Sequence, residues 1–265
     1  MKSVMRAFRS YQQMQAHNGR DGYAAQLASS SDHITRAQTL HAAVYLDRRY
    51  IDVTDIGIDS RMHAAADPYQ FHSNYFVVTR VDDGRVVATA RQIFARRNGG
   101  HTSFPTMAKL EIYPTLRAAI EQVDPACCVE ISGLAKEKGV DPHAVLLLYR
   151  SMWQFSLVRG HKVWLMACDV NAYKRLKFIF GDALVRIGRD TIYMGSAVVP
   201  AMLEVDRSIA PLLHESRTLN LAKSLMKRRL VAFMMSGLPE SYRSVKRRPV
   251  SGFVELSKQA EANSA

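Results

Sequence analysis

The sequence lacks any apolar run long enough to span a membrane, and its N-terminus lacks the apolar core of a secretory signal. It holds only three cysteines, Cys127, Cys128 and Cys168, an odd and sparse set that makes no disulfide framework. These absences predict a cytoplasmic protein in a reducing compartment. We interpret the three cysteines as small buried hydrophobic residues rather than nucleophiles.

Signals for metals and nucleic acids are missing as well. No histidine or cysteine shows metal-ligand spacing, so no metal site is predicted. The formal net charge of +12 favours acidic partners, and nucleic acid is one such partner. However, the chain has no zinc-finger spacing, no RNP-like aromatic strand and no repeated basic-aromatic interleaving, so we expect no nucleic-acid partner.

The stretch from Cys127 to Ala135, CCVEISGLA, has the pattern of a β-strand. Period-two alternation puts two sets on opposite faces: Val129, Ile131 and Gly133 on one, and Cys128, Glu130, Ser132 and Leu134 on the other. A buried carboxylate is costly unless it is paired or hydrogen-bonded, so Glu130 beside Ser132 marks a candidate site. A solvated Glu130, or one paired with an arginine, is the alternative interpretation.

Helix and strand signals alternate around this strand. The runs 75–81 and 85–93, joined by Asp82-Asp83-Gly84, predict a β-hairpin. Capping residues open two predicted helices, Ser31-Asp32 before the first and Asp141-Pro142 before the second. The complete predicted order is helix 34–52, the hairpin, strand 127–135, helix 142–159, strand 162–168, helix 171–180, and strands 183–187 and 191–199.

This order resembles the GNAT acyltransferase fold over about residues 23 to 200, and more narrowly its N-acyl amino acid synthases and acyl-homoserine-lactone synthases. The motifs that carry the resemblance stand in the family's order: Arg36, Asp67-Pro68-Tyr69, Val86 to Arg91, and Glu130-Ile131-Ser132-Gly133. Two residues depart from the family pattern. Gly133 stands in the place of an arginine, and an alanine replaces the glycine of the motif that ends at Arg91.

The resemblance implies an α/β (α+β), GNAT-like fold with a central mixed, mostly antiparallel twisted sheet flanked by helices. We expect three parts: a basic amphipathic N-terminal arm over 1–22, an acyltransferase domain over 23–200, and a basic helical C-terminal extension over 201–265. The basic helix expected over 219–238 suits peripheral contact with an anionic membrane. Packing against the domain or a second subunit is the favoured interpretation of that helix.

The implied chemistry is attack of an amine on a thioester, which needs a proton acceptor and donors aimed at the carbonyl oxygen. Glu130 is the candidate base, direct or through water, and Ser132 binds substrate or assists proton transfer. The thioester is expected near Gly133, Leu134 and Ala135. Arg91 either holds the carboxylate of an amino-acid acceptor or pairs with Glu130. The resemblance adds Arg36 and Asp67 as substrate-binding candidates.

The residues after this strand argue against a diphosphate-bearing donor. Acetyl-CoA-dependent GNAT proteins have a glycine-rich loop here whose N–H groups cradle the pyrophosphate. The loop 136–142 keeps one glycine, Pro142 lacks an N–H, and Asp141 would repel phosphate. We therefore expect no bound cofactor and an acyl carrier protein thioester as donor, with acyl-CoA less favoured.

Basic and aromatic residues complete the prediction. Four basic residues are candidates for contact with the acidic carrier protein, or equally for a solubilising surface: Lys136, Lys138, Lys174 and Arg175. Trp153, Phe155 and Trp164 line a candidate acyl pocket, or are ordinary core.

The sequence thus predicts an N-acyltransferase that moves a medium or long acyl chain from acyl carrier protein to the amine of an amino acid. One alternative is an inactive GNAT-like module that binds acyl carrier protein or a membrane surface, which the missing arginine at Gly133 favours. The other alternative is an acyl-homoserine-lactone synthase.

Overall fold

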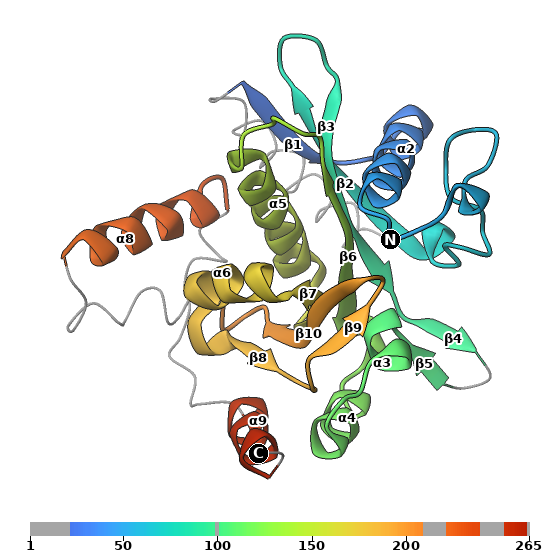
Figure 1. Cartoon of the computed structure of the whole chain (residues 1–265). Coiled ribbons are helices and arrows are strands. Elements are labelled where there is room, and N and C mark those ends of the chain that lie inside the picture. Colours follow the sequence, from blue (N-terminus) through green and yellow to red (C-terminus); the bar gives the residue numbers. More distant parts are fainter. Residues whose placement is uncertain (1–21, 99–100, 209–220, 239–251, 264–265) are drawn as a thin grey trace, which may run out of the picture. The chain divides into compact units, whose positions relative to one another are not determined.

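The computed structural model describes residues 22–98, 101–208, 221–238 and 252–263 (Figure 1). The chain divides into two compact units. The first unit comprises residues 1–94 and 131–159, and the second comprises residues 95–130 and 160–265. The predicted N-terminal arm lies outside the described residues, apart from Gly22.

The first unit packs helices on both faces of an antiparallel sheet. In Figure 1, α2 and α5 lie on opposite sides of these strands, and both contact β2 and β3. Neighbouring residues of one strand accordingly face different helices. Tyr75 contacts Gln38 of α2, whereas the ring of Phe76 packs edge-on against Phe155 of α5. The elements of this unit are β1 (Tyr23–Leu27), α2 (Ser31–Asp47), β2 (Ser73–Arg80), β3 (Val86–Phe94) and α5 (His143–Arg159).

The second unit is built on strands with helices packed against them. Helix α6 contacts β7 and β10, while α9 contacts α4 and β8. Its elements are β4 (Arg96–Asn98), β5 (His101–Ser103), α3 (Pro105–Lys109), α4 (Pro114–Glu121), β7 (Val163–Asp169), α6 (Val170–Phe180), β8 (Leu184–Arg186), β9 (Thr191–Tyr193), β10 (Ser196–Glu204), α8 (Leu221–Met235) and α9 (Gly252–Ala262).

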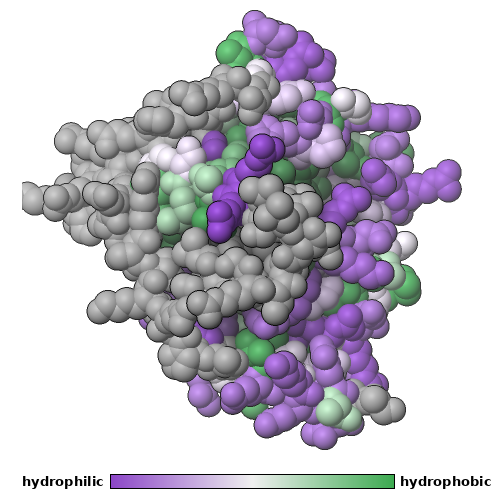
Figure 2. Space-filling model, turned by 90° about the vertical axis from the view of Figure 1, so that its left-hand side faces the viewer, coloured by the Kyte–Doolittle hydropathy of each residue, from purple (hydrophilic) through white to green (hydrophobic). Residues whose placement is uncertain are grey.

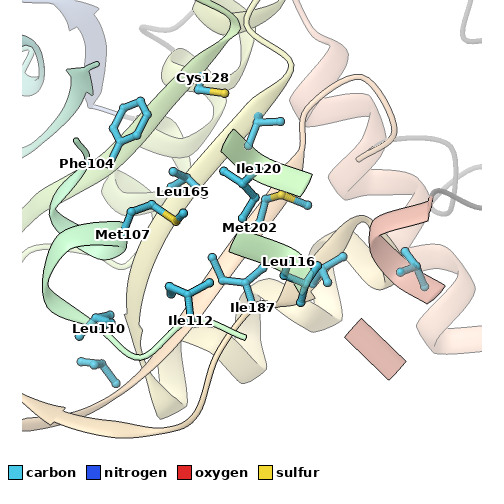
Figure 3. Packing of buried hydrophobic residues seen from close by; sticks show 14 residues of the cluster. Phe104, Met107, Leu110, Ile112, Leu116, Ile120, Cys128, Leu165, Ile187 and Met202 are labelled. Atoms are coloured by element: carbon cyan, nitrogen blue, oxygen red, sulfur yellow. The ribbon is translucent and has the colours of Figure 1, made fainter. Parts of the chain in front are cut away.

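An apolar cluster forms the core of the second unit (Figure 3). The segment 104–120 contributes much of it, because α4 turns Leu116 and Ile120, four residues apart, toward the strands. Leu165 and Met202 meet them from β7 and β10. Val254 of α9 belongs to the same cluster, so residues beyond the predicted boundary at 200 contribute to this compact unit.

Strand β6 (Cys128–Lys136) belongs to both units. The boundary falls between Glu130, in the second unit, and Ile131, in the first. The order of hydrogen-bonded strands is β1-β2-β3-β6-β7-β10-β8, with β9 on β10. The β6–β7 pair is parallel, and the pairs β1–β2, β2–β3, β7–β10, β8–β10 and β9–β10 are antiparallel. The expected mixed, mostly antiparallel sheet flanked by helices is confirmed.

Most predicted elements form, with shifted ends. The hairpin is confirmed, and Gly84 takes the positive φ of 66° that its turn requires. Helix α2 is capped by Ser30 rather than Ser31-Asp32 and ends at Asp47, not at 52. Helix α6 is capped by Asp169. The predicted final strand over 191–199 is two strands, β9 and β10, turned at Met194 and Gly195.

Helices α8 and α9 lie within the range of the predicted extension. Helix α8 is confirmed within the range 219–238, but Met202 lies in β10 rather than in a helical tail. None of the described helices has the length and apolar character that crossing a membrane requires. On the face displayed in Figure 2, most of the coloured residues are hydrophilic, with smaller hydrophobic patches between them.

Gly188 holds the segment before α4 close to β8. A β-carbon at this position would lie 2.0 Å from the carbonyl oxygen of Glu111, and Ile112 and Gly188 form an isolated β-bridge. Because that obstacle is backbone, Gly188→Ala should lower the free energy of unfolding by about 2–3 kcal/mol, the upper range for overpacking. Urea denaturation checks this value. Gly195→Ala is the comparison variant. Its added carbon meets nothing within 4 Å and only its φ of 75° is unfavourable, so its loss of stability should be smaller.

Candidate functional site

A buried ion pair joins Arg91 of β3 to Asp67, which lies in the connection between α2 and β2. The Arg91 Nη1 donates to Asp67 Oδ2 at 2.5 Å, and Nη2 donates to Oδ1 at 3.0 Å. Both side chains are less than a tenth exposed. Burial alone would lower the pKa of Arg91, but the charge and hydrogen bonds of Asp67 outweigh it and raise that pKa. The geometry is the two-pronged contact that suits guanidinium and carboxylate.

A line of hydrogen bonds extends from this pair to helix α2. Arg91 Nη1 also donates to the Tyr75 hydroxyl at 3.3 Å, and Gln38 Nε2 donates to the same hydroxyl at 3.5 Å. Arg61 Nη1 in turn donates to Gln38 Oε1 at 2.9 Å. These contacts fasten two points of the 48–72 connection, Arg61 and Asp67, to the regular elements of the first unit.

His41 of α2 and Gly133 of β6 meet on the same side of the first unit's strands. His41 is 4% exposed, and a β-carbon on Gly133 would lie 3.1 Å from its Cε1 and 3.4 Å from Arg91 Cγ. Gly133 also has a φ of 63°, which interrupts regular alternation along the strand. Burial first, and the charge of Arg91 second, lower the pKa of His41 well below its ordinary value. His41 is therefore neutral at pH 7.

Glu130, the predicted base, is buried in the second unit with 3% of its surface exposed. Its Oε2 accepts from the backbone N–H of Thr106 and its Oε1 accepts from the Thr106 hydroxyl, both at 2.9 Å. The two bonds hold the carboxylate in one orientation. The paired part of β6 and β7 covers Cys128 to Glu130, so this carboxylate lies at the end of that ladder.

The other predicted residues of β6 lie in the first unit. Ser132 and Leu134 are half-buried, while Gly133 and Ala135 are buried. Arg91, Asp67 and Gly133 of the predicted substrate-binding set are brought together. Arg36 instead lies on the exposed side of α2, where its guanidinium pairs with Asp32 at 3.0 Å. The geometry offers Arg36 no support as a substrate ligand.

The predicted aromatic candidates are buried, and most of the predicted basic candidates are exposed. Trp153, Phe155 and Trp164 are all buried, at 2%, 4% and 0% exposure. Lys138, Lys174 and Arg175 are exposed, as a docking residue must be. Lys136 differs from them, because its ammonium donates to the carbonyl oxygens of Glu137 and Val140.

The cysteines behave largely as predicted. Cys128 and Cys168 are buried, and burial raises the pKa of each to about 12, which keeps both thiols protonated. Cys127 is half-buried instead. No group of histidine, cysteine, aspartate and glutamate suited to a metal ion occurs among the described residues.

Two residues of the site escaped the sequence prediction, His41 and Thr106. The available signal for His41 was its helical spacing from Ala37 and Gln38, which puts the three on one face of a helix. In the structure the buried residues of α2 are Ala37, Gln38, His41 and Ala42. A histidine and a glutamine on a helix face that packs against a sheet need polar contacts there.

No family model matches the sequence, and no curated protein matches it either. Solved structures do match the fold. FeeM, an N-acyl amino acid synthase from uncultured soil microbes, aligns with a TM-score of 0.54 at 13% identity, covering 71% of this chain and 93% of FeeM. The acyl-homoserine-lactone synthase LasI aligns with a TM-score of 0.54 at 16% identity, covering 69% of this chain and 90% of LasI.

A third structure covers more of the chain. BjaI, a CoA-dependent acyl-homoserine-lactone synthase, aligns with a TM-score of 0.52 at 15% identity, over 89% of this chain and 97% of BjaI. At such low identity the likeness concerns the fold alone. The chain therefore has the GNAT-like fold that FeeM, LasI and BjaI share, as the order of its sequence motifs predicted.

Proposed function

We propose that this protein is an N-acyltransferase that moves a medium or long acyl chain from an acyl carrier protein thioester to the amine of an amino acid. The amine nitrogen attacks the thioester carbon, a C–N bond forms, and the C–S bond breaks to release the carrier thiol. Glu130 takes the proton from the amine, directly or through water. Ser132 and backbone N–H groups near Gly133 bind the reacting groups.

The observation that carries this proposal is the buried, doubly hydrogen-bonded carboxylate of Glu130 in a GNAT-like fold. Burial of a carboxylate costs free energy, which the two bonds from Thr106 offset. A fixed orientation is what proton transfer to a positioned base requires.

The start of helix α5 supports a carrier-protein donor over CoA. The N–H of His143 donates to the side chain of Asp141 at 2.7 Å, and the N–H groups of Ala144 and Val145 donate to carbonyls of residues 141 and 142. A pyrophosphate at this helix end would meet occupied N–H groups and the Asp141 charge. The phosphopantetheine of a carrier protein carries a single phosphate, which does not depend on such a cradle.

A comparison of donors tests the proposal. The purified full chain is given the same acyl group on acyl carrier protein and on CoA, with free amino acids as acceptors. We expect kcat/KM to be at least about tenfold higher for the carrier protein, because exposed basic residues attract it. Mass spectrometry should identify N-acyl amino acids. Equal or better use of acyl-CoA would overturn the donor assignment, and an acyl-homoserine lactone would favour the alternative.

Charge-reversal variants sharpen this comparison. Lys174 and Arg175 are exposed on α6, so Lys174→Glu with Arg175→Glu should raise the KM for the carrier protein and leave the KM for CoA unchanged. Lys258→Glu, an exposed change of the same sign on α9 that reverses one charge instead of two, is the control. A control effect half as large, on a logarithmic scale, as that of the double variant would show that only net charge matters.

A further inference from the structure

Nε2 of His41 and Nε of Arg91, both in the first unit, are buried and have no hydrogen-bond partner among the described residues. Their side chains are 4% and 5% exposed. Both border the bare α-carbon of Gly133, where a β-carbon would lie 3.3 Å from His41 Nε2 and 3.4 Å from Arg91 Cγ. Buried polar atoms are rarely left unsatisfied in folded proteins, so such a pair points to a ligand.

The two atoms offer complementary chemistry. Arg91 Nε carries a hydrogen and can only donate, and the terminal nitrogens of that guanidinium already donate to Asp67. Burial first, and the Arg91 charge second, lower the pKa of His41, so its neutral ring presents a lone pair at Nε2 in the tautomer that carries the proton on Nδ1. In that tautomer the pair supplies one donor and one acceptor. Because Asp67 balances Arg91 and His41 is neutral, the cluster as a whole has no net charge.

We propose that His41 and Arg91 together bind the acceptor as a zwitterionic α-amino acid. Arg91 Nε–H donates to an oxygen of the α-carboxylate, and His41 Nε2 accepts a hydrogen bond from the α-amine. An α-amino acid carries these two groups on one carbon, and their opposite charges cancel, which matches a neutral donor-acceptor pair. The inference rests on the proposed function and names the residues that hold its amino-acid acceptor. It assigns His41 to substrate binding and leaves proton removal to Glu130.

Gly133 makes this arrangement possible. Any side chain there would press on the His41 ring, and the φ of 63° would be strained for any other residue. The arginine that the resemblance would put at this position would strain the backbone and would require the His41 ring to shift. The neutral imidazole of His41, from α2, lies beside the position where that arginine would begin. This argues against interpreting Gly133 as a sign of lost function.

Direct binding tests this inference without an acyl donor. The twenty free L-α-amino acids are added to the full chain, and binding is measured by thermal shift and calorimetry. For each amino acid that binds, its decarboxylated amine and its carboxamide are the comparison probes. We expect at least one α-amino acid to bind, and both derivatives to bind at least about tenfold more weakly, since each lacks the carboxylate charge.

Variants of His41 and its neighbour complete the test. His41→Phe should weaken amino-acid binding at least about tenfold, and His41→Gln, which keeps an amide near Nε2, should retain part of it. Tyr45→Phe is the matched control, because the Tyr45 ring packs edge-on against His41 at 4.1 Å and the ring is kept. Circular dichroism shows which variants are folded. Unchanged affinity in folded His41→Phe would overturn the proposal.

The outcomes separate this inference from the proposed function. Amino-acid binding without acyl transfer from any donor would keep the inference and reject the function. Acyl transfer to amines that lack a carboxylate, at equal rates in the wild type and His41→Phe, would support N-acyl transfer as the reaction and reject the inference. Failure of every α-amino acid to bind the wild-type chain would also reject the inference.

Discussion

Replacement of Glu130 by glutamine should lower kcat for acyl transfer by about 10²–10⁴-fold, the range that a positioned general base contributes. Glutamine has the size of glutamate but cannot accept the proton of the attacking amine. The measurement is the initial rate of product formation with acyl carrier protein as donor, at saturating amino acid. Wild-type turnover by Glu130→Gln would exclude Glu130 as the base.

The same change should leave the fold intact. The glutamine Oε1 can accept from the N–H of Thr106, as Glu130 Oε2 does, while its Nε2 donates to the Thr106 hydroxyl oxygen, which can also accept. The thermal unfolding of Glu130→Gln should therefore stay close to that of the wild type. Thr106→Val is the matched control, because it removes the hydroxyl and keeps both the backbone N–H and the base. We expect it to retain far more activity than Glu130→Gln.

Asp67→Ala should be the most destabilising change in the first unit, by about 3–5 kcal/mol, the cost of leaving one member of a buried ion pair uncompensated. Arg91 is 5% exposed and its positive charge cannot be released by deprotonation. Urea denaturation measures the loss. Asp59→Ala is the matched control, since Asp59 also pairs with an arginine but at an exposed position, and we expect almost no change there.

A double variant distinguishes unpaired charge from lost packing. When Arg91→Met accompanies Asp67→Leu, no charge is left buried, and the loss should be clearly smaller than in Asp67→Ala. A double variant as unstable as the single one would show that the pair matters through shape alone. Neither variant is expected to bind an α-amino acid, because Arg91 Nε is absent or displaced.

Local signals account for the elements that the sequence predicted. The hairpin follows from a glycine with positive φ between two β-rich runs, and α5 follows from Asp141-Pro142 at its start and Gly160 at its end. The segment 104–121 was missed because α3 and α4 are short and each begins with a proline, so neither shows a long helical period. Both instead contribute side chains to the apolar core of the second unit, together with β7 and β10.

Partner choice within the site depends on contacts far apart in the sequence. The pattern identified Arg91, Asp67 and Glu130 as special, and it left open whether Arg91 pairs with Glu130. In the structure Arg91 pairs with Asp67, and Thr106 binds Glu130. Alternation along a strand gives the face of a residue but not the element that packs on that face. For the same reason, the sequence alone could not bring His41 to Gly133.

The most direct test of N-acyl transfer is mass spectrometry of lipid extracts from bacterial cells that express the full chain, beside cells that express Glu130→Gln. We predict N-acyl α-amino acids in the wild-type extract that are absent, or reduced at least a hundredfold, in the variant extract. Their masses would give the acyl length and the acceptor. No new acylated amine from a folded wild-type protein, or equal amounts in both extracts, would contradict the account.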